Sequence, residues 1–422
     1  MALNYNDPDE VLNFTLKLVI TQALDHIPVV GEILGAIAEA IWPDVGQAPT
    51  YTPDQMFDAL KDRISGLIGQ AISANDVALM QATLTGMSKD ISNYMNAITG
   101  DELNQFDAAH SSLDLALPDF QLKGQEVVLL PLYTQAVNAH LAFLRHGYLN
   151  CMSWPNTGNI NMKLWQAQVL ADLQKAIAAA VKYVPPIYAS GLADAKTNAP
   201  VAGVPVSAGG TRGSGAARFN YINDYIRETT LAVLDYAELW PFFDPVAYPN
   251  PVKHSYTRYL YGTAFGLART DEIVLPSPPT GPIRRISYDR WIDGGGVNAV
   301  HQLKLDYDPG KGPDGKDSTG VMGIANPAPN NFFPSISTEI DGIDVITVQS
   351  WVGDIVDGLQ FTGMWNGQNY TSELHGSTGN DPVVTNGMAG HKVSSVYIDG
   401  QLFWNGAELP DVFVAGYHYD PS

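Results

Sequence analysis

The amino-acid sequence predicts a multidomain protein of the α and β classes, with a helical first half and an all-β second half. Apolar residues recur at helical spacing through most of residues 7–240, which is the pattern of amphipathic helices. From about residue 283 onward, short alternating runs rich in Val, Ile, Tyr, Phe and Trp are separated by Gly, Asp, Asn and Pro, which is typical of strands. A chain of 422 residues is also long enough for two or three domains, each with its own core.

The predicted helices follow one another from the N-terminus. The first begins at Asp7, because this N-cap residue precedes a proline and two acids that suit the first helical turn. Further helical patterns cover residues 27–42, 52–72, 74–99, 122–148, 160–184 and 216–240, which makes six or seven helices. We expect Pro185 and Pro186 to end the helix that starts near residue 160. Residues 198–215, rich in Gly, Pro, Ala and Ser, predict an exposed connection.

A proline-rich segment, Leu275–Pro282, predicts the linker between the two halves, so we expect domains at 1–275 and 276–422. The second half contains a weak internal repeat, in which residues 294–307 align with residues 353–365, and a poorer copy covers residues 393–404. Repetition of a turn followed by a hairpin favours related sheets around a pseudo-threefold axis.

Composition excludes several classes of protein. Forty-four acidic and 23 basic residues give a net charge of -21, which opposes binding to nucleic acid. Cys151 is the only cysteine, so no intramolecular disulfide can form. The N-terminus lacks the basic region and the apolar stretch of a secretory signal, so we expect a chain made soluble without a signal peptide.

The uncharged run from Val127 to Leu144 bears most directly on function. Its eighteen residues would span roughly 27 Å as a helix, which nearly crosses a hydrocarbon core of about 30 Å. Such a helix must be surrounded by other helices in water. Two interpretations stay open: the buried centre of a soluble bundle, or a helix stored in a bundle for release into a bilayer.

Several segments in the first 265 residues resemble the three-domain insecticidal δ-endotoxins. The segments, in the order of the family's motifs, are Pro28–Ile37 with Trp42-Pro43, Leu130–Arg145, Phe219–Leu239 with Pro241–Pro249, and Tyr256–Gly262. The resemblance implies a seven-helix bundle around a central buried helix at residues 122–148. It also implies that a helical hairpin containing this helix enters the target membrane as a homo-oligomer. The residues expected to mark the inserting helix are Leu132, Gln135, Asn138, His140 and Leu141. Some 140 residues follow residue 280, enough for one β-domain, so we expect the family's third domain to be absent.

The second domain of these toxins is a β-prism, and the repeat also resembles jacalin-related lectins, which share that prism. Such lectins bind sugars at a Gly-x-x-x-Asp turn, and Gly353, Asp354 and Asp357 fit this pattern, with Trp351 or Trp365 available to stack on a sugar. We expect an exposed carboxylate on this turn. Gly and Asp are also ordinary turn residues, so a plain turn stays open. Residues 416–420 match the same pattern and rank second.

No catalytic motif is recognisable: there is no Gly-x-Ser-x-Gly, no P-loop and no His-Glu-x-x-His. We expect no catalytic residues, no metal site and no cofactor. The leading hypothesis is a pore-forming toxin whose partners are the target-cell membrane, a surface glycan or glycoprotein receptor, and further copies of itself. It would be held in the cytoplasm or in inclusions and act outside the cell. The alternatives are a lectin without pore activity and, last, a glycosidase using carboxylate pairs such as Asp341 with Asp344, or Asp354 with Asp357.

Overall fold

The computed structural model describes most of the chain from residue 100 onward and nine residues before it. The described residues are 82–83, 86–87, 89–91, 93–94, 100–155, 160–201, 214–249, 256, 258–266, 273–292, 298–323, 340–341, 344–352, 355–365, 367–378, 383–388, 391–399, 402–404 and 407–419. The helices predicted over residues 7–20, 27–42 and 52–72 therefore lie outside the described residues. The chain forms two compact units: a helical unit of residues 1–198 and 228–254, and a β unit of residues 199–227 and 255–422. The domain boundary predicted at residue 275 stays a prediction, and the compact units divide the chain elsewhere.

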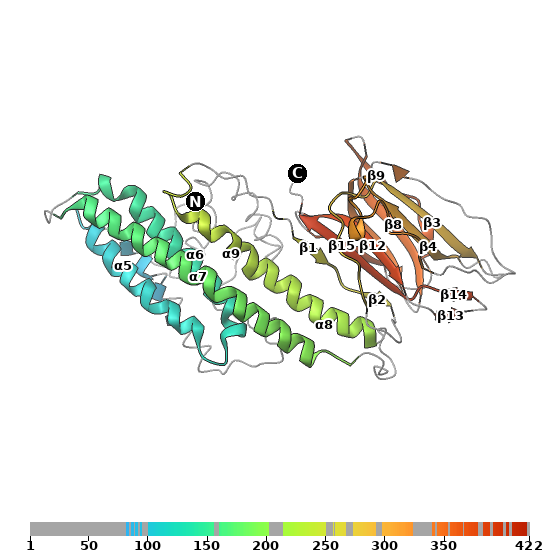
Figure 1. The fold of residues 1–422 in the computed structure, drawn as a ribbon, viewed down its shortest axis with the longest axis horizontal. Coiled ribbons are helices and arrows are strands. Elements are labelled where there is room, and N and C mark those ends of the chain that lie inside the picture. The colour runs from blue at the N-terminus through green and yellow to red at the C-terminus, as the bar shows by residue number, and fades with distance from the viewer. Residues whose placement is uncertain are drawn as a thin grey trace. The chain divides into compact units, whose positions relative to one another are not determined.

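The described helical segments follow one another along the chain (Figure 1). They are α5 (Glu102–Ala116), η1 (Leu117–Gln121), α6 (Glu126–Asn150), η2 (Cys151–Ser153), α7 (Met162–Asn198), α8 (Ser214–Thr229), the π-helical η3 (Thr230–Leu234), α9 (Asp235–Leu239) and η4 (Trp240–Phe243). The described residues between 82 and 94 are helical as well. The helical first half is confirmed, whereas the predicted count of seven helices stays a prediction.

One helix was not predicted from the sequence, and another is longer than predicted. Helix α5 had no predicted counterpart, although Leu103, Phe106, Ala109 and Leu113 place its buried face at helical spacing. Helix α7 continues to Asn198, so the expectation that it ends at Pro185-Pro186 was wrong. Both prolines are exposed, so the carbonyl groups that lose a helical hydrogen bond at this point lie on the solvent side of the helix.

The described residues of the β unit form three main sheets and one short hairpin. The strand orders are β1-β15-β12 with β2 beside β15, β10-β8-β7-β11 with β9 beside β8, and β5-β4-β3-β6; β13 pairs with β14. The strands are β1 (Tyr259–Tyr261), β2 (Phe265–Gly266), β3 (Arg285–Ile292), β4 (Asn298–Asp306), β5 (Met322–Gly323), β6 (Ile340–Asp341), β7 (Asp344–Val352), β8 (Val356–Trp365), β9 (Gln368–Thr371), β10 (His375–Gly376), β11 (Val383–Asn386), β12 (His391–Asp399), β13 (Leu402–Trp404), β14 (Ala407–Leu409) and β15 (Val412–Tyr419). One apolar core receives side chains from all three sheets, for example Leu303, Phe361 and Phe413.

The two clearer copies of the sequence repeat occupy equivalent positions in antiparallel hairpins. Strand β4 begins at Asn298 opposite Ile292, and β8 begins at Val356 opposite Val352. Each copy therefore supplies the second strand of a hairpin, β3 with β4 and β7 with β8. Hairpins at matching positions in two sheets explain why the turn sequences recur.

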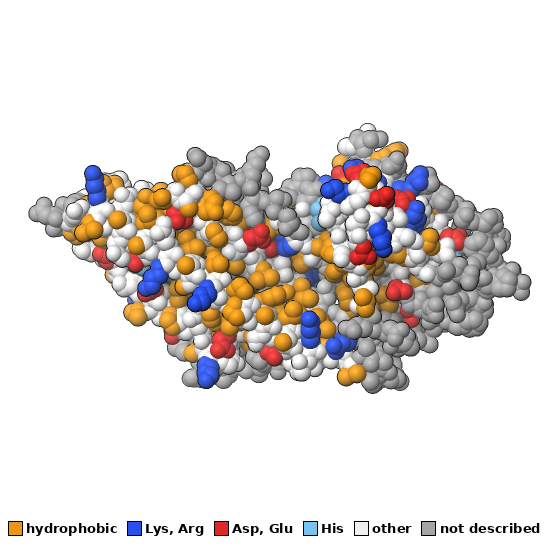
Figure 2. Space-filling model, viewed as in Figure 1, with side chains coloured by type: hydrophobic (Ala, Val, Ile, Leu, Met, Phe, Trp, Pro, Cys, Tyr) orange, Lys and Arg blue, Asp and Glu red, His pale blue; other side chains and the backbone are white. Residues whose placement is uncertain are grey.

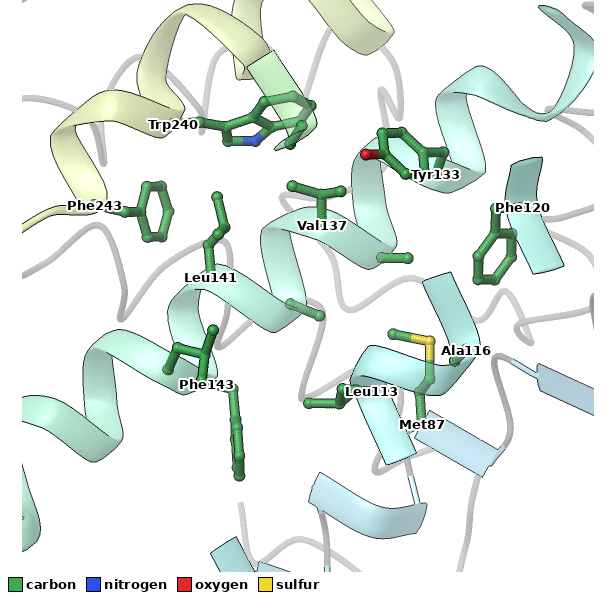
Figure 3. Packing of buried hydrophobic residues seen from close by; sticks show 14 of the residues in the cluster. Met87, Leu113, Ala116, Phe120, Tyr133, Val137, Leu141, Phe143, Trp240 and Phe243 are labelled. Atoms are coloured by element: carbon green, nitrogen blue, oxygen red, sulfur yellow. The ribbon is translucent and has the colours of Figure 1, made fainter. Parts of the chain in front are cut away.

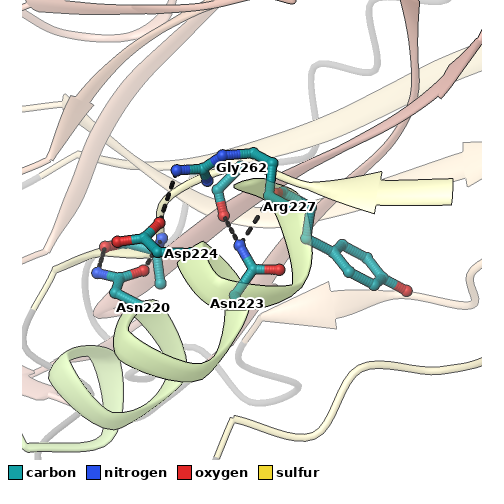
Figure 4. Close-up of polar contacts among 7 residues, drawn as sticks. Asn220, Asn223, Asp224, Arg227 and Gly262 are labelled. Atoms are coloured by element: carbon teal, nitrogen blue, oxygen red, sulfur yellow. Dashed lines mark hydrogen bonds and ion pairs between the residues drawn. The ribbon is translucent and has the colours of Figure 1, made fainter. Parts of the chain in front are cut away.

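The first strand of the β unit is attached to α8 by two buried asparagine side chains (Figure 4). Asn220 donates to the Ala264 carbonyl at 2.9 Å and accepts from the Ala264 N–H at 2.6 Å. Asn223 donates to the carbonyls of Tyr261 and Gly262 at 2.9 and 3.1 Å. The two side-chain amides thus bond backbone N–H and C=O groups at and just after the end of the short strand β1, which have no partner strand on that side among the described strands.

The proline-rich segment predicted as a linker packs against the β unit. The Tyr261 hydroxyl donates to the Pro276 carbonyl at 3.2 Å, and the Ser277 N–H donates to Asp314 Oδ1 at 2.9 Å. Leu275 packs against a small apolar cluster that includes Val412. The prediction that this segment links the two halves stays a prediction, and its side chains and backbone are engaged with the β unit.

Candidate functional site: the buried helix

Helix α6 is the candidate functional element of the helical unit. Within the described part of the chain, one helical segment is long and apolar enough to cross a membrane: Glu126–Ser153, with a mean hydropathy of 1.4 in its most apolar window. All of that window is buried in the structure. The prediction of a central helix over residues 122–148 is confirmed in its position, and the helix is enclosed as an all-round apolar helix must be in water.

The apolar surroundings of α6 come from helices before and after it. Figure 3 shows Trp240 and Phe243 facing α6 on one side, and Met87 and Leu113 on the other. The Phe106 ring of α5 stacks on Phe143 of α6 with ring centroids 4.4 Å apart. Among the predicted inserting residues, Leu132 is 5% exposed and Leu141 is fully buried. Both are ordinary core side chains in this form of the protein.

Two of the predicted polar residues of α6, Asn138 and Gln135, are hydrogen-bonded to each other. Asn138 is buried; its Oδ1 accepts a hydrogen bond from Trp240 Nε1 at 2.7 Å, and its amide donates to Gln135 Oε1 at 3.4 Å. Gln135 is half-buried. The Asn138–Trp240 bond joins residues 102 positions apart and was not predicted, because no local pattern in the sequence marks such a pair.

His140 is buried at the floor of a groove between α5 and α7. The groove has a volume of about 310 Å³ and is lined on its sides by His110 and Asp114 of α5 and by Asp172 and Lys175 of α7. The His110 and His140 ring centroids lie 5.5 Å apart. Neither ring nitrogen of His140 has a hydrogen-bond partner among the described residues.

The C-terminal part of α6 is fixed by Arg145. Its guanidinium donates to the carbonyls of Phe243 at 2.8 Å and Phe242 at 3.3 Å, both in η4. Helix-end carbonyls lack partners within the helix, so a cation placed there is favourable. Together with the Asn138–Trp240 bond, Arg145 fastens α6 to the segment that follows α9.

The candidate sugar site lies at the β7–β8 hairpin. Gly353 and Asp354 lie outside the described residues. Trp351 is half-buried at the end of β7. Asp357 is the second residue of β8 and only 8% exposed, and its carbonyl accepts from the Ser377 N–H at 3.0 Å. The expectation of an exposed carboxylate at Asp357 was wrong, because the chain at Gly376 and Ser377 lies against it.

The second sugar pattern, at residues 416–420, is not a turn where it is described. Gly416 lies inside β15, where it pairs with Tyr261 of β1 and with Ser395 of β12. A residue paired on both sides in a sheet cannot present its backbone N–H to a sugar. Within the described residues, no group of three or more His, Cys, Asp or Glu side chains could hold a metal ion.

Comparisons with known proteins agree with this architecture. Residues 19–244, more than half of the chain, match the family model of the delta endotoxin, N-terminal domain. The pesticidal crystal protein Cry19Aa of Bacillus thuringiensis subsp. jegathesan is 27% identical over 249 residues, covering 55% of this chain and 35% of that protein. Cry1Ae of subsp. alesti is 30% identical over 263 residues, covering 58% of this chain and 20% of that protein. The chain therefore matches only about a fifth to a third of the length of these relatives.

The solved structure of the insecticidal delta-endotoxin Cry8Ea1 from Bacillus thuringiensis has the same fold over nearly the whole chain. The superposition has a TM-score of 0.68 at 19% identity and covers 98% of this chain and 74% of that one. At this level of identity the superposition shows a shared fold. The chain belongs to the delta-endotoxin family, with the family match in its N-terminal domain.

Proposed function

We propose that this chain is a non-enzymatic pore-forming toxin, which stores α6 in the helical unit and inserts a hairpin containing α6 into a target-cell membrane. The observation that carries the proposal is the contrast in α6: its segment is apolar enough to cross a membrane, and its most apolar window is buried in the folded chain. In water, burial shields its apolar surface, and in a bilayer lipid would do so. Membership of the delta-endotoxin family supports the same activity.

The inserted state would use the polar residues of α6 differently. Asn138, Gln135 and His140 would face water or neighbouring helices, because polar side chains in a bilayer avoid lipid. Leu132 and Leu141 would supply apolar surface. Such a helix is best accommodated among further copies of itself, which supports insertion as a homo-oligomer. Since the relatives are named crystal proteins, we propose storage in an inclusion and action on the membranes of other cells.

Substitution of Ala142 tests insertion. Ala142 is half-buried, packs against the core and lies in the uncharged run, so Asp and Asn of similar size at this position disturb the folded core to a similar extent. Ala142 lies two residues before the end of the uncharged run, so a carboxylate there would lie in the outer part of the hydrocarbon core, where it costs less than the roughly 3 kcal/mol that it costs at the centre but more than an uncharged amide. Dye release from phosphatidylcholine vesicles is expected to fall strongly for Ala142→Asp and much less for Ala142→Asn. Equal release by Ala142→Asp and the unchanged chain would show that another element crosses the membrane.

For the β unit we propose binding to a surface glycan or a glycoprotein receptor. Support comes from three sheets around one core, the arrangement expected of a β-prism, and from Trp351 beside the β7–β8 turn. Trp365, 45% exposed at the other end of β8, offers a second aromatic surface. A glycan array with the intact chain and with Asp354→Asn and Asp357→Asn tests the site. Retained glycan binding by both variants would exclude the β7–β8 turn as the sugar-binding site.

The second candidate function is a lectin without pore activity, favoured by the match of residues 353–357 to a sugar-binding turn. Agglutination assays and dye release on the same glycan-bearing vesicles separate the two functions. Agglutination without release would support the lectin and refute the pore.

A further inference from the structure

Four large apolar side chains are exposed where α6 ends and α7 begins. The exposed fractions are 49% for Leu149, 51% for Met152, 39% for Ile160 and 69% for Leu164. We call these four residues the end patch. Exposed apolar side chains are ordinary when scattered, but a cluster of them within residues 149–164 marks an interaction surface.

The two sides of the end patch are held together by contacts beneath it. Gln166 of α7 donates to the Tyr148 carbonyl of α6 at 2.9 Å. The Trp154 and Trp165 rings meet edge to face with centroids 5.6 Å apart, and both pack against the core of the helical unit. The end patch is therefore a fixed surface at one end of the helical unit, and Figure 2 shows hydrophobic side chains reaching the surface of this unit.

The charges around the end patch differ from those of the whole chain. No Asp or Glu occurs between Glu126 and Asp172, in a chain with 44 acids. The stretch carries two bases. Arg145 is committed to backbone carbonyls, and Lys163 is exposed.

Acidic side chains of the neighbouring α5 are engaged locally. Asp107 accepts from Trp165 Nε1 at 3.2 Å, and Glu102 accepts from the Gly100 N–H at 2.7 Å. A hydrogen-bonded carboxylate keeps its charge, so the exposed Asp107 beside Trp165 and the exposed Lys163 lie next to four uncharged patch residues. One charge of each sign suits an apolar or zwitterionic partner better than a strongly charged one.

We propose that the end patch is the surface through which the folded chain first contacts a lipid bilayer with zwitterionic headgroups. The proposal rests on the proposed function. The candidate membrane-crossing segment, Glu126–Ser153, ends inside the patch, so contact there brings the stored helix next to lipid before the bundle opens. Two indoles at the base of the patch suit the bilayer interface, where Trp is enriched. The net charge of -21 opposes an anionic surface as the first partner.

A double substitution tests the patch directly. Leu164→Ser with Met152→Ser removes two exposed side chains that make few contacts in the folded chain. Val181→Ser is the matched control: it is 38% exposed on the same helix, about 26 Å further along α7. Binding to phosphatidylcholine vesicles, measured by co-sedimentation, is expected to weaken about tenfold or more for the double variant and less than about twofold for the control. Circular dichroism checks that both variants fold.

A labelled chain supplies a second readout. Leu164→Cys in a Cys151→Ser background, labelled with the environment-sensitive dye NBD, is expected to brighten on phosphatidylcholine vesicles before dye release begins. Addition of phosphatidylserine to the vesicles is expected to weaken binding. Equal vesicle binding by the double variant and the unchanged chain would overturn the proposed role of the end patch in lipid contact. The proposed pore function would stand if both chains still released dye.

Other outcomes also overturn the proposal. Loss of both binding and release in the unchanged chain would refute the proposed function together with the patch. A dimer in solution that the double variant dissociates would assign the patch to a second copy of this chain.

Discussion

Replacement of Trp240 by Phe tests whether the bond between Trp240 and Asn138 holds α6 in storage. Trp240 is fully buried and Asn138 is 6% exposed, and their hydrogen bond is 2.7 Å long. The substitution leaves Asn138 Oδ1 without its donor, which costs about 1–3 kcal/mol for a buried acceptor. The smaller ring loses roughly 1 kcal/mol more of apolar burial. We therefore expect the helical unit to lose about 2–4 kcal/mol of unfolding free energy.

The same substitution makes a prediction about release. Trp240 is outside α6, so Trp240→Phe weakens the stored state without changing the inserted helix. Since 1.4 kcal/mol corresponds to a factor of ten, dye release from vesicles is expected to accelerate by about tenfold or more. Urea unfolding followed at 222 nm, and initial rates of dye release, are the two measurements.

The control for this experiment is Trp365→Phe. Trp365 is 45% exposed at the end of β8, outside the helical unit, so its replacement is expected to cost less than about 1 kcal/mol and to leave release from phosphatidylcholine vesicles unchanged. If Trp240→Phe lowers stability but leaves the release rate unchanged, α6 does not separate from Trp240 in the rate-limiting step, and the storage argument is refuted.

Three further predictions concern packing, pH and a helix end. Gly147→Ala is expected to cost about 1–3 kcal/mol, because the added Cβ would overlap the Phe106 ring, which is stacked and cannot easily move; a smaller loss in urea unfolding contradicts this packing. Burial lowers the pKa of His375 from 6.5 to about 4. Between these pH values the unfolded chain binds a proton that the folded β unit does not, so stability falls by about 1.4 kcal/mol per pH unit below 6.5 and is unaffected above it. His375→Phe is expected to abolish the fall in unfolding free energy that His375 causes between pH 7 and 5. An unchanged dependence of the unfolding free energy on pH in this variant would refute the prediction. Arg145→Met is expected to cost about 1–3 kcal/mol by unpairing the carbonyl of Phe243, read as a lower urea midpoint; an unchanged midpoint would mean that water replaces the guanidinium.

The sequence predicted α6 well because its signal is strong and local. An uncharged run of this length has few alternatives in a soluble protein, and it became the buried centre of the helical unit. Helix α5 was missed because Asp, Asn and Ser, which favour caps and turns, lie between its buried residues. The prolines of α7 were misread because exposure on one side of a helix lets the unpaired carbonyls face solvent.

Long-range contacts account for the rest of the difference between expectation and structure. Asp357 resembled an exposed turn residue, but the chain at Gly376 and Ser377 covers it, and no local pattern announces that contact. The pairing of Asn138 with Trp240 is of the same kind. Both contacts come from the packing of distant segments, whereas periodicity and capping describe only neighbours along the chain.

The central claim is that α6 leaves the bundle and enters the bilayer. Ala142→Cys in a Cys151→Ser background places an NBD label on the half-buried side of α6, within the apolar run. Quenching by lipids brominated at different depths of the acyl chain then measures where the label lies on vesicles undergoing dye release. Because Ala142 lies two residues before the end of the uncharged run, the account predicts strongest quenching by lipids brominated between the bilayer centre and the headgroups. A label that stays unquenched while dye escapes would show that α6 remains in the bundle and would contradict the account.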